Sequence, residues 1–251
     1  MRRQWSLMSH TLYCPVCEHG VQAFLPLPSY YEQKWREHGF IEADHEPETL
    51  NKRAYSCPRC GASDRDRLCT LYLKQALPRF QKETRLIDFA PSTPLATWVR
   101  RNFAGEYRAA DLYMEGVDDR VDITQMNVYA DESVDVFICS HVLEHVPDDA
   151  AAARELHRIL KPGGFGLVLA PIDIRLDDTF EDGSQVLAES DRWRLYGQGD
   201  HVRYYSKKGF VNRMRQASFK VAEFGVGHFS QGVFDRCGIA TASVLYVVAK
   251  S

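Results

Sequence analysis

The chain has 251 residues, of which 45% are hydrophobic and 26% are charged, an ordinary balance for a protein that buries a large core. Its formal net charge of −3 gives no general attraction to nucleic acid or acidic membranes, and no apolar run reaches the roughly 20 residues that span a bilayer. Seven cysteines, an odd number, argue against a disulfide framework, and the first ten residues lack the apolar core of a secretory signal. We therefore expect a cytoplasmic protein.

Two Cys-Pro-x-Cys pairs stand near the amino terminus, at 14–17 and 57–60. A Cys-x-x-Cys turn presents two thiolates to one tetrahedral ion, and two such turns complete a closed structural zinc site. A redox-active or disulfide pair is the alternative, but a redox pair usually opens a helix beside a βαβ unit, and here each pair precedes a loop. With a predicted helix over Ser29–His38 between the pairs, residues 1–63 resemble an interrupted zinc ribbon. The predicted ligands of this structural zinc are Cys14, Cys17, Cys57 and Cys60.

A helix is predicted next, over Asp64–Leu77, and its first turn carries Arg65 and Arg67. Two interpretations of these arginines stay open. They form a solvated helical turn, or one of them reaches a ligand cleft from the zinc module.

Alternating strand and helix patterns follow. Arg85–Ala90 predicts a buried strand, and the loop after it offers a helix start, with Thr93 as amino-terminal cap and a proline at the first helical position. Tyr107–Ala110 predicts a second strand that ends in Asp111, and the segment Val117–Thr124 comes next. This order is typical of a parallel α/β sheet.

The apolar run Val134–Cys139 predicts another buried strand, with Ser140 and His141 at its carboxyl end. Ligands in open α/β sheets lie beyond the carboxyl ends of the strands. Ser140, His141 and, after the following strand, Pro171 therefore indicate a binding site.

The connection to that following strand is equally regular. A helix is predicted over Ala150–Leu160, with Asp148 or Asp149 as its cap. The Pro-Gly-Gly sequence at 162–164 then stops the helix and turns the chain into a strand over Gly166–Ala170.

Residues 172–204 form a long polar segment, and loops of this length usually act as lids, bind ligands or are disordered. Its aromatic residues, including Trp193 and Tyr196, argue against disorder and favour a lid. The tail predicts a helix over Lys207–Ala217, then strands over Phe219–Phe224 and Ser243–Ala249.

Several short motifs of the sequence resemble those of class I S-adenosylmethionine-dependent methyltransferases. VDVFICS, HVLEHVPD and RELHRILKPGG are similar to the region from the fourth to the fifth strand of that fold. The word FAP after the first strand and the word GQGDHVRYY at 197–205 resemble a bacterial group of these enzymes with an N-terminal four-cysteine zinc ribbon. The resemblance implies an α/β, Rossmann-like, doubly wound seven-stranded sheet whose last strand is antiparallel. The methyltransferase domain would span 64–251, with the lid at 172–204.

The resemblance further implies S-adenosyl-L-methionine as cofactor. Asp88 matches the acidic residue of the first strand and is expected near the methionine ammonium. Asp111 matches the acid that binds the ribose hydroxyls, and Asp122, beside Ile123, matches the acid that pairs with the adenine amino group. The alternative for Asp111 and Asp122 is that each only caps a turn.

The loop after the first strand departs from the family, because its glycines are missing and Ala90 and Ser92 take their place. Free amide groups at the start of the next helix could meet the cofactor carboxylate. The complete predicted cofactor set is Asp88, Ala90, Pro91, Ser92, Asp111, Leu112, Asp122, Ile123, Ser140 and His141.

Methyl transfer is an in-line displacement at the sulfonium methyl carbon, and a hydroxyl or protonated amine acceptor needs a base. His201, paired with Asp200 or Tyr204, is the first candidate for this base, and His141 is the second. The alternative is that Asp200 and His201 only tie the lid to the sheet. Arg203, together with the glutamine at 198, is expected to orient the substrate.

The segment His141-Val-Leu-Glu144-His145 has the spelling of an inverted zinc-protease motif. That motif needs a long helix and a third ligand, whereas Pro147 follows within two residues. We therefore expect His141 to line the cleft, and His145 and Glu144 to be structural or catalytic without a protease metal.

Together these features predict methyl transfer to a hydroxyl or amine of a polar small molecule, such as a sugar or natural-product intermediate. One alternative is an RNA methyltransferase, but residues 1–60 show no dense basic cluster, so nucleic acid is not favoured as a partner. The other is a non-catalytic binding module, which the missing glycines favour and the acidic residues oppose. No membrane partner is expected, and the oligomeric state is left open.

Overall fold

The computed structural model describes residues 12–182 and 187–251. Within these residues, seven strands form one sheet in the order β10-β11-β7-β6-β3-β4-β5. The central strands are parallel, and β11 runs antiparallel to both of its neighbours, β7 and β10. This confirms the predicted seven-stranded, Rossmann-like sheet with an antiparallel last strand. The strands are β3 Arg85–Phe89, β4 Glu106–Asp111, β5 Asp119–Arg120, β6 Val134–Ser140, β7 Leu160–Leu169, β10 Lys220–Phe224 and β11 Leu245–Ala249.

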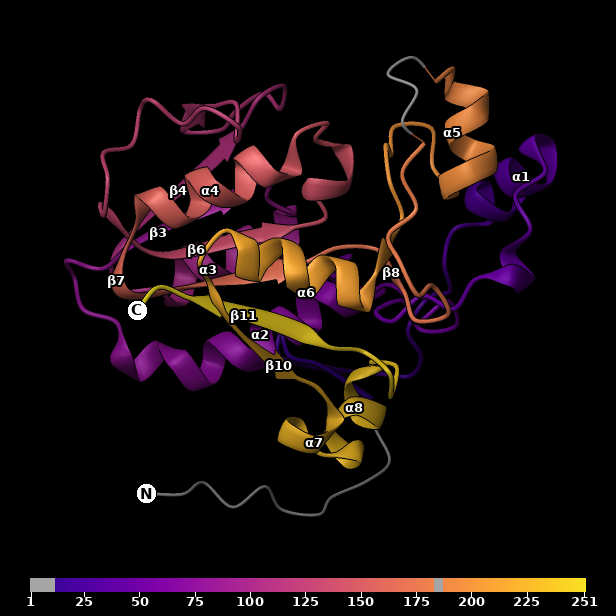
Figure 1. Cartoon of the computed structure of the whole chain (residues 1–251). Helices are drawn as coiled ribbons and strands as arrows, with labels where there is room; N and C mark the ends of the chain where they lie inside the picture. The colour runs from indigo at the N-terminus through magenta and orange to yellow at the C-terminus, as the bar shows by residue number, and fades with distance from the viewer. Residues whose placement is uncertain (1–11, 183–186) are drawn as a thin grey trace.

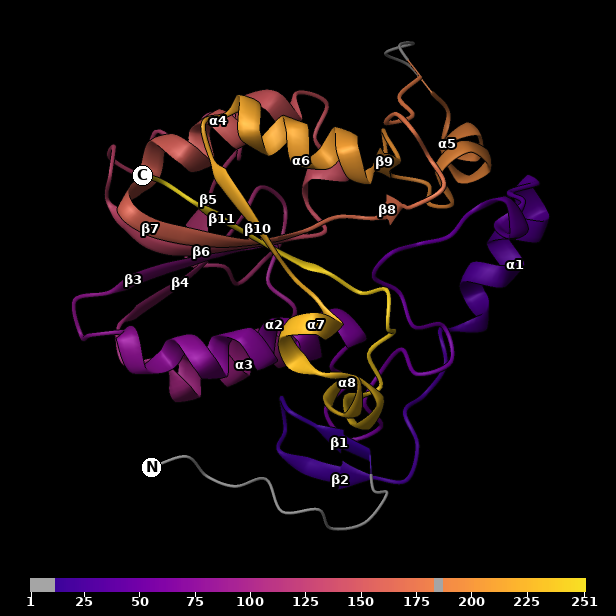
Figure 2. The ribbon, with the colours of Figure 1, turned by 60° about the horizontal axis from the view of Figure 1, so that its bottom comes forward.

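Helices cover both faces of the sheet (Figure 2). One face carries α4 (Asp149–Ile159) and α6 (Lys207–Gln216), and the other carries α2 (Asp64–Ala76) and α3 (Thr93–Asn102). Side chains of a strand alternate between faces, so neighbouring residues of β3 enter different cores. Ile87 packs toward α4 and α6, in one buried cluster with Phe210. Leu86 belongs to the opposite cluster, with Trp98 of α3.

The amino-terminal segment begins with a hairpin of β1 (Leu12–Cys14) and β2 (His19–Val21), which lies beside α8 (Gln231–Cys237) in Figure 2. Cys14 and Val21 are buried in the same cluster as Leu68 of α2 and Phe234 of α8. The hairpin therefore shares its core with the face of the sheet that carries α2 and α3. The remaining short helices here are α7 (Val226–Phe229) and the 3₁₀ turns η1 (Glu42–Asp44), η2 (Leu77–Arg79) and η3 (Leu143–His145).

The segment between the two cysteine pairs extends from the hairpin to the predicted lid. Its helix α1 (Ser29–His38) packs against α5 (Glu189–Tyr196), which belongs to the predicted lid (Figure 1). The lid is fixed to the body by a two-stranded sheet of β8 (Ile172–Asp173) and β9 (Tyr205–Ser206). The two segments thus lie side by side although about 150 residues separate them in the chain.

Most predicted boundaries hold to within one or two residues, and the cap of α3 differs for a physical reason. The cap of α3 is Ser92, not Thr93, because the Ser92 side chain accepts the Leu95 amide. The segment Val117–Thr124 forms only the two-residue strand β5. The predicted last strand begins at Leu245 rather than Ser243.

The Pro-Gly-Gly sequence is a bulge within β7 rather than a turn before it. Leu160 pairs with Val134 and Phe165 pairs with Val136, so residues 161–164 loop out opposite a single residue of β6. Gly163 has a φ of +77°, which glycine adopts without strain. The helix therefore ends at Ile159, and the strand starts immediately after it.

None of the helices within the described residues combines the length and the apolar character needed to cross a membrane.

Candidate functional site

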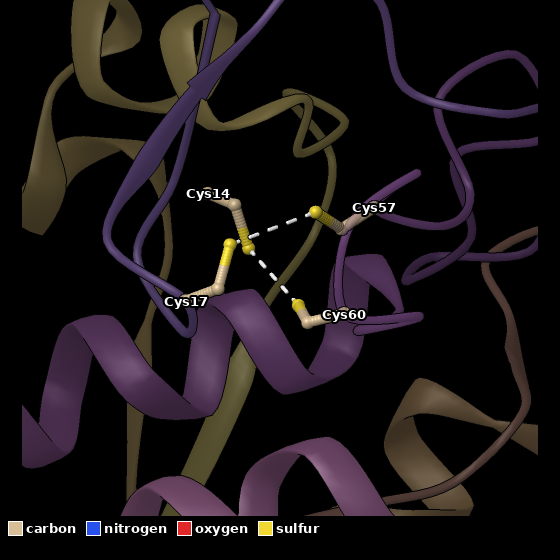
Figure 3. A group of neighbouring side chains, drawn as sticks. All are labelled: Cys14, Cys17, Cys57 and Cys60. Atoms are coloured by element: carbon tan, nitrogen blue, oxygen red, sulfur yellow. Dashed lines mark hydrogen bonds between the residues drawn. The ribbon is translucent and has the colours of Figure 1, made fainter.

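Four cysteine thiols from two distant turns converge at the base of α2 (Figure 3). Sγ of Cys14 lies 3.8 Å from Sγ of Cys60, and Sγ of Cys17 lies 3.9 Å from Sγ of Cys57. None of the four is in a disulfide. A tetrahedral Zn²⁺ with Zn–S bonds of about 2.3 Å separates its sulfur ligands by about 3.8 Å. The predicted ligand quartet is thus brought together at the spacing that such an ion requires.

The carboxyl ends of β3, β4 and β6 lie side by side, since β3 pairs with both of the others. Two non-glycine residues at this edge have left-handed backbone: Ala90 after β3 with φ of +49°, and His141 after β6 with φ of +57°. Such conformations cost of order 1 kcal/mol or more and concentrate at functional sites. Ala90 therefore makes the sharp turn that a glycine makes elsewhere, and alanine is the smallest residue that has a Cβ.

Asp88 lies within β3 and is 2% exposed. Its carboxylate accepts a hydrogen bond of 2.8 Å from the hydroxyl of Tyr107 on β4. Burial raises the pKa of Asp88 to about 7, although the Tyr107 hydrogen bond acts against that rise. Ser92 is committed to neighbouring structure, because its hydroxyl donates to Oδ1 of Asp66 on α2 at 2.7 Å. Pro91 is partly exposed between them.

Asp111 and Asp122 both cap turns at the exposed edge of the sheet. Oδ1 of Asp111 accepts the amides of Tyr113 and Met114, at 2.7 and 2.6 Å. Oδ1 of Asp122 accepts the amide and the hydroxyl of Thr124, at 2.8 and 2.7 Å. In each case these bonds involve only Oδ1 of the carboxylate. Both residues therefore cap turns, as the alternative interpretation predicted. The Oδ2 atoms take no part in these bonds and can contact a ligand.

The surroundings of these two acids differ. Leu112, Tyr113 and Met114 are exposed, with Tyr113 at 83%, whereas Ile123 is buried in the core. An exposed apolar surface next to a carboxylate suits the aromatic base and ribose of a nucleoside.

Glu144 occupies the centre of a group of histidines after β6. It is fully buried, and Nδ1 of His141 lies 3.0 Å from its Oε1. Nε2 of His145 is 4.0 Å from the same oxygen, and the rings of His145 and His201 are 4.8 Å apart and nearly perpendicular. Asp200 lies against His145, with its Oδ2 3.4 Å from Nδ1 of that ring, rather than forming an ion pair with His201.

The charges of this group are set by burial and by each other. Burial would raise the pKa of Glu144, but the surrounding rings, first of all His141, hold it at about 2. Burial lowers the pKa of His201 to about 4, against the attraction of the Glu144 carboxylate. Burial and the Arg65 guanidinium also lower the pKa of His141. At neutral pH these two imidazoles are therefore unprotonated and can accept a proton.

A pocket with about 90 Å³ of free space adjoins this group. Its walls come from the segment between the cysteine pairs, from the end of the sheet and from the lid. The lining residues are Leu27, Tyr31, Trp35, Phe40, Glu42, His45, Pro47, Thr49, Leu50, Lys52, Tyr55, Arg65, His141, Pro171, Ile172, Tyr196, Gly197, Gln198, His201 and Tyr204. Of the predicted catalytic residues, His141, His201 and Tyr204 thus share one pocket.

Arg65 lines this pocket and donates to the hydroxyl of Tyr55 at 2.7 Å. Arg67 is fully buried and structural. Its guanidinium donates to backbone carbonyls that include those of Cys237 and Ala62, and it lies 4.0 Å over the ring of Phe24.

The predicted role of Arg203 in orienting substrate is wrong. The side chain is 2% exposed and donates to the carbonyls of Leu143, Val146 and Pro147, so it fastens the lid to the turn after β6. Gln198, by contrast, lines the pocket.

The sequence did not predict the part of the pocket wall that is formed by residues 27–55, which come before the sheet in the chain. Tyr31 and Trp35 come from α1, and Glu42 and Lys52, which form an ion pair, come from the loops after it. The only available signal was the concentration of aromatic and charged residues between the two cysteine pairs.

One family model matches the part of the chain that runs from the end of η2 into β7. Residues 80–168 match a family model described as "Methyltransferase domain". Among proteins with curated descriptions, none matches this chain. Similar solved structures include Haemonchus contortus phosphoethanolamine N-methyltransferase 2 with S-adenosyl-L-methionine, at 14% identity and a TM-score of 0.47 over 76% of this chain and 53% of that chain.

Two further similar structures come from microbes. The YcgJ protein of Bacillus subtilis has 16% identity and a TM-score of 0.45, over 72% of this chain and 97% of that chain. A SAM-dependent methyltransferase of Archaeoglobus fulgidus has 11% identity and a TM-score of 0.46, over 73% and 92%. The family match adds a methyltransferase domain to the sheet order described above. This match agrees with the predicted enzyme class: residues 80–168 of the chain match a methyltransferase domain.

Proposed function

We propose that this enzyme methylates a hydroxyl or amine of a polar small molecule bound in the pocket between α1, the lid and His141. The observation that carries the proposal is the convergence of His141, His201 and Arg65 on one pocket beside the carboxyl end of β6. The small volume of the pocket favours a metabolite over a polymer. Its mixed lining of aromatic and charged side chains suits a polar acceptor.

The cofactor would lie across the carboxyl ends of β3, β4 and β6. When bound, S-adenosyl-L-methionine supplies an electrophilic methyl group on a sulfonium. We assign Asp111 to the ribose through its second oxygen, and the exposed Leu112 surface and Asp122 with Ile123 to the adenine. Asp88, the turn Ala90–Pro91–Ser92, Ser140 and His141 would surround the methionine end.

The proton of the acceptor would go to an imidazole. His141 and His201 are the candidates, because burial keeps both rings unprotonated and both line the pocket. Tyr204 would contribute a wall of the pocket, and Asp200 would act through its contact with His145.

We assign a structural Zn²⁺ to Cys14, Cys17, Cys57 and Cys60, whose sulfur spacing matches tetrahedral coordination. Its role follows from its position. Helix α2 begins four residues after Cys60, and Arg65 in the first turn of that helix lines the pocket. The ion would therefore hold the base of a substrate-facing helix and has no access to the acceptor.

Calorimetric titration with S-adenosyl-L-methionine and S-adenosylhomocysteine tests the proposal. We expect micromolar binding to the native protein and a loss of at least tenfold for Asp111→Ala. Asp131→Ala is the matched control. That carboxylate is exposed, forms an ion pair with Arg158 and lies just before the amino end of β6, at the edge of the sheet opposite the predicted cofactor site. Zinc-loaded, folded protein that binds neither compound would refute the cofactor assignment.

A second measurement tests the acceptor pocket. With candidate polar acceptors, His201→Ala and Arg65→Met should lose turnover while binding of the cofactor persists. Unchanged turnover in both variants would place the acceptor elsewhere.

A further inference from the structure

The carboxylate of Glu144 is in an unusual environment for a buried charge. The residue is fully buried, and Nδ1 of His141 lies 3.0 Å from its Oε1, whereas Oε2 has no hydrogen-bond partner in the described part of the chain. Nδ1 of His201 and Nε2 of His141 are likewise buried without partners. Leaving such groups unpaired is costly, and a cation at this position would satisfy several of them at once.

We propose that Glu144, His145 and His201 bind a divalent transition-metal ion at the wall of the acceptor pocket. One potential ligand atom from each of the three residues lies within 4.8 Å of the others. Adjacent ligands of an ion bound at about 2.1 Å are about 3.0–3.4 Å apart, so the most distant pair of these groups would need to draw together by up to about 1.5 Å.

The donor set selects the kind of ion. Two imidazoles and one carboxylate suit first-row ions such as Mn²⁺, Fe²⁺, Co²⁺, Ni²⁺ or Zn²⁺, whereas Mg²⁺ and Ca²⁺ prefer oxygen ligands alone. His145 already has the outer partner that metal-binding histidines usually have. Its Nε2 is the nitrogen near Glu144, and its Nδ1 lies 3.4 Å from Oδ2 of Asp200.

The positions of these ligands in the chain differ from those in a zinc protease. Glu144 and His145 lie in the single 3₁₀ turn η3 rather than on a long helix, and the third ligand, His201, arrives from the lid. Metal binding would therefore join the lid to the end of β6. A backbone hydrogen bond also holds His201 near Glu144, because the amide of the next residue, Val202, donates to the carbonyl of Glu144 at 2.9 Å.

The catalytic use of this ion rests on the proposed function, although its binding does not. An acceptor hydroxyl held by this ion would lose its proton to His141 more readily. Its oxygen would then form the new bond to the methyl carbon as the bond from that carbon to the sulfonium breaks and S-adenosylhomocysteine leaves. His201 would then be a ligand, and His141 would remain as the base that takes the proton.

Titration of the zinc-loaded protein with Co²⁺ tests the site. Cobalt held by nitrogen and oxygen shows weak d–d absorption bands without the intense sulfur-to-cobalt band of a cysteine site. We expect each chain to bind one equivalent of Co²⁺ with this weak absorption. His145→Gln, whose side chain is 34% exposed and tolerant of change, and the isosteric Glu144→Gln should each weaken uptake at least tenfold. His228→Gln, an exposed histidine beside Gln75, is the control.

Two outcomes overturn the site: no uptake by native protein, or uptake that survives both substitutions at full strength. X-ray absorption of the native cobalt complex is an independent check that needs no variant, and sulfur ligands alone would refute the proposal. Because neither cofactor nor acceptor is present in these measurements, failure of methyl transfer with intact cobalt uptake would count against the proposed function only.

Discussion

Nδ1 of His45 lies 2.7 Å from Oδ2 of Asp173, and this contact joins the segment between the cysteine pairs to the first residues of the lid. Asp173 is fully buried, and its Oδ1 also accepts the amides of Glu46 and Arg175, at 3.1 and 2.9 Å. One carboxylate thus holds three donors from two chain segments. Because both segments line the pocket, its shape depends on this residue.

Asp173→Ala should therefore destabilise the protein by about 2–4 kcal/mol, since buried donors lose their acceptor. Urea unfolding measures the change. Asp178→Ala is the control, because its side chain is 86% exposed and it should change stability by less than about 0.5 kcal/mol. Equal stability of the two variants would contradict the role assigned to Asp173.

Asp88 should make stability depend on pH. Its folded pKa of about 7 is above the unfolded value of about 3.9, so the folded state holds the proton more tightly. The contribution is complete below about pH 4 and is lost as pH rises through about 7, on the order of 4 kcal/mol in all. The free energy of unfolding of Asp88→Asn, compared with native protein at pH 5 and pH 8, should lack this decline. A parallel decline in the variant would assign it to other groups.

Arg67→Met should be among the most damaging substitutions in the chain. The guanidinium is fully buried and donates to five backbone carbonyls, which would all lose their donor. We expect a loss of about 3–5 kcal/mol, measured by thermal or chemical unfolding. Arg101→Met, at an exposed position of α3, provides the control and should be nearly neutral.

Removal of the zinc ion proposed for the four cysteines should unfold the hairpin of β1 and β2. Their buried residues are few, so the ion would supply most of the local stability. Titration of the native protein with a thiol-binding mercurial in the presence of a metal indicator should release one Zn²⁺, and Cys57→Ser should purify with none at that site. Retention of one Zn²⁺ by Cys57→Ser, and also by Cys57→Ser combined with Glu144→Gln or His145→Gln, would show that these cysteines are not its ligands.

The sheet and the cysteine cluster were predictable because their signals are local. Strand β6 is a continuous apolar run, Asp148 caps α4 as expected, and each Cys-x-x-Cys pair is contained in one turn. The contacts that build the pocket are not local. Nothing near Arg203 in the sequence shows that its donors would be used by the turn after β6, which is 56 to 60 residues away.

The same distinction applies within the candidate site. His141 could be placed at the pocket because it directly follows a strand. The central position of Glu144 depends on the lid folding back so that His201 meets the turn η3, and no sequence pattern records that approach. The corrected cap at Ser92 has a similar cause, since its hydroxyl bonds Asp66 from another helix.

The arrangement of α1 against α5 has a consequence for folding kinetics. The indole of Trp35 donates to the carbonyl of Gly197 at 2.9 Å, across 162 positions of the chain. Contacts of such long range are formed at a high entropic cost and usually late. We expect the sheet to assemble first and the pocket to close last. In the native protein, amide hydrogens of α1 and α5 should accordingly exchange with solvent faster than those of β3 and β6.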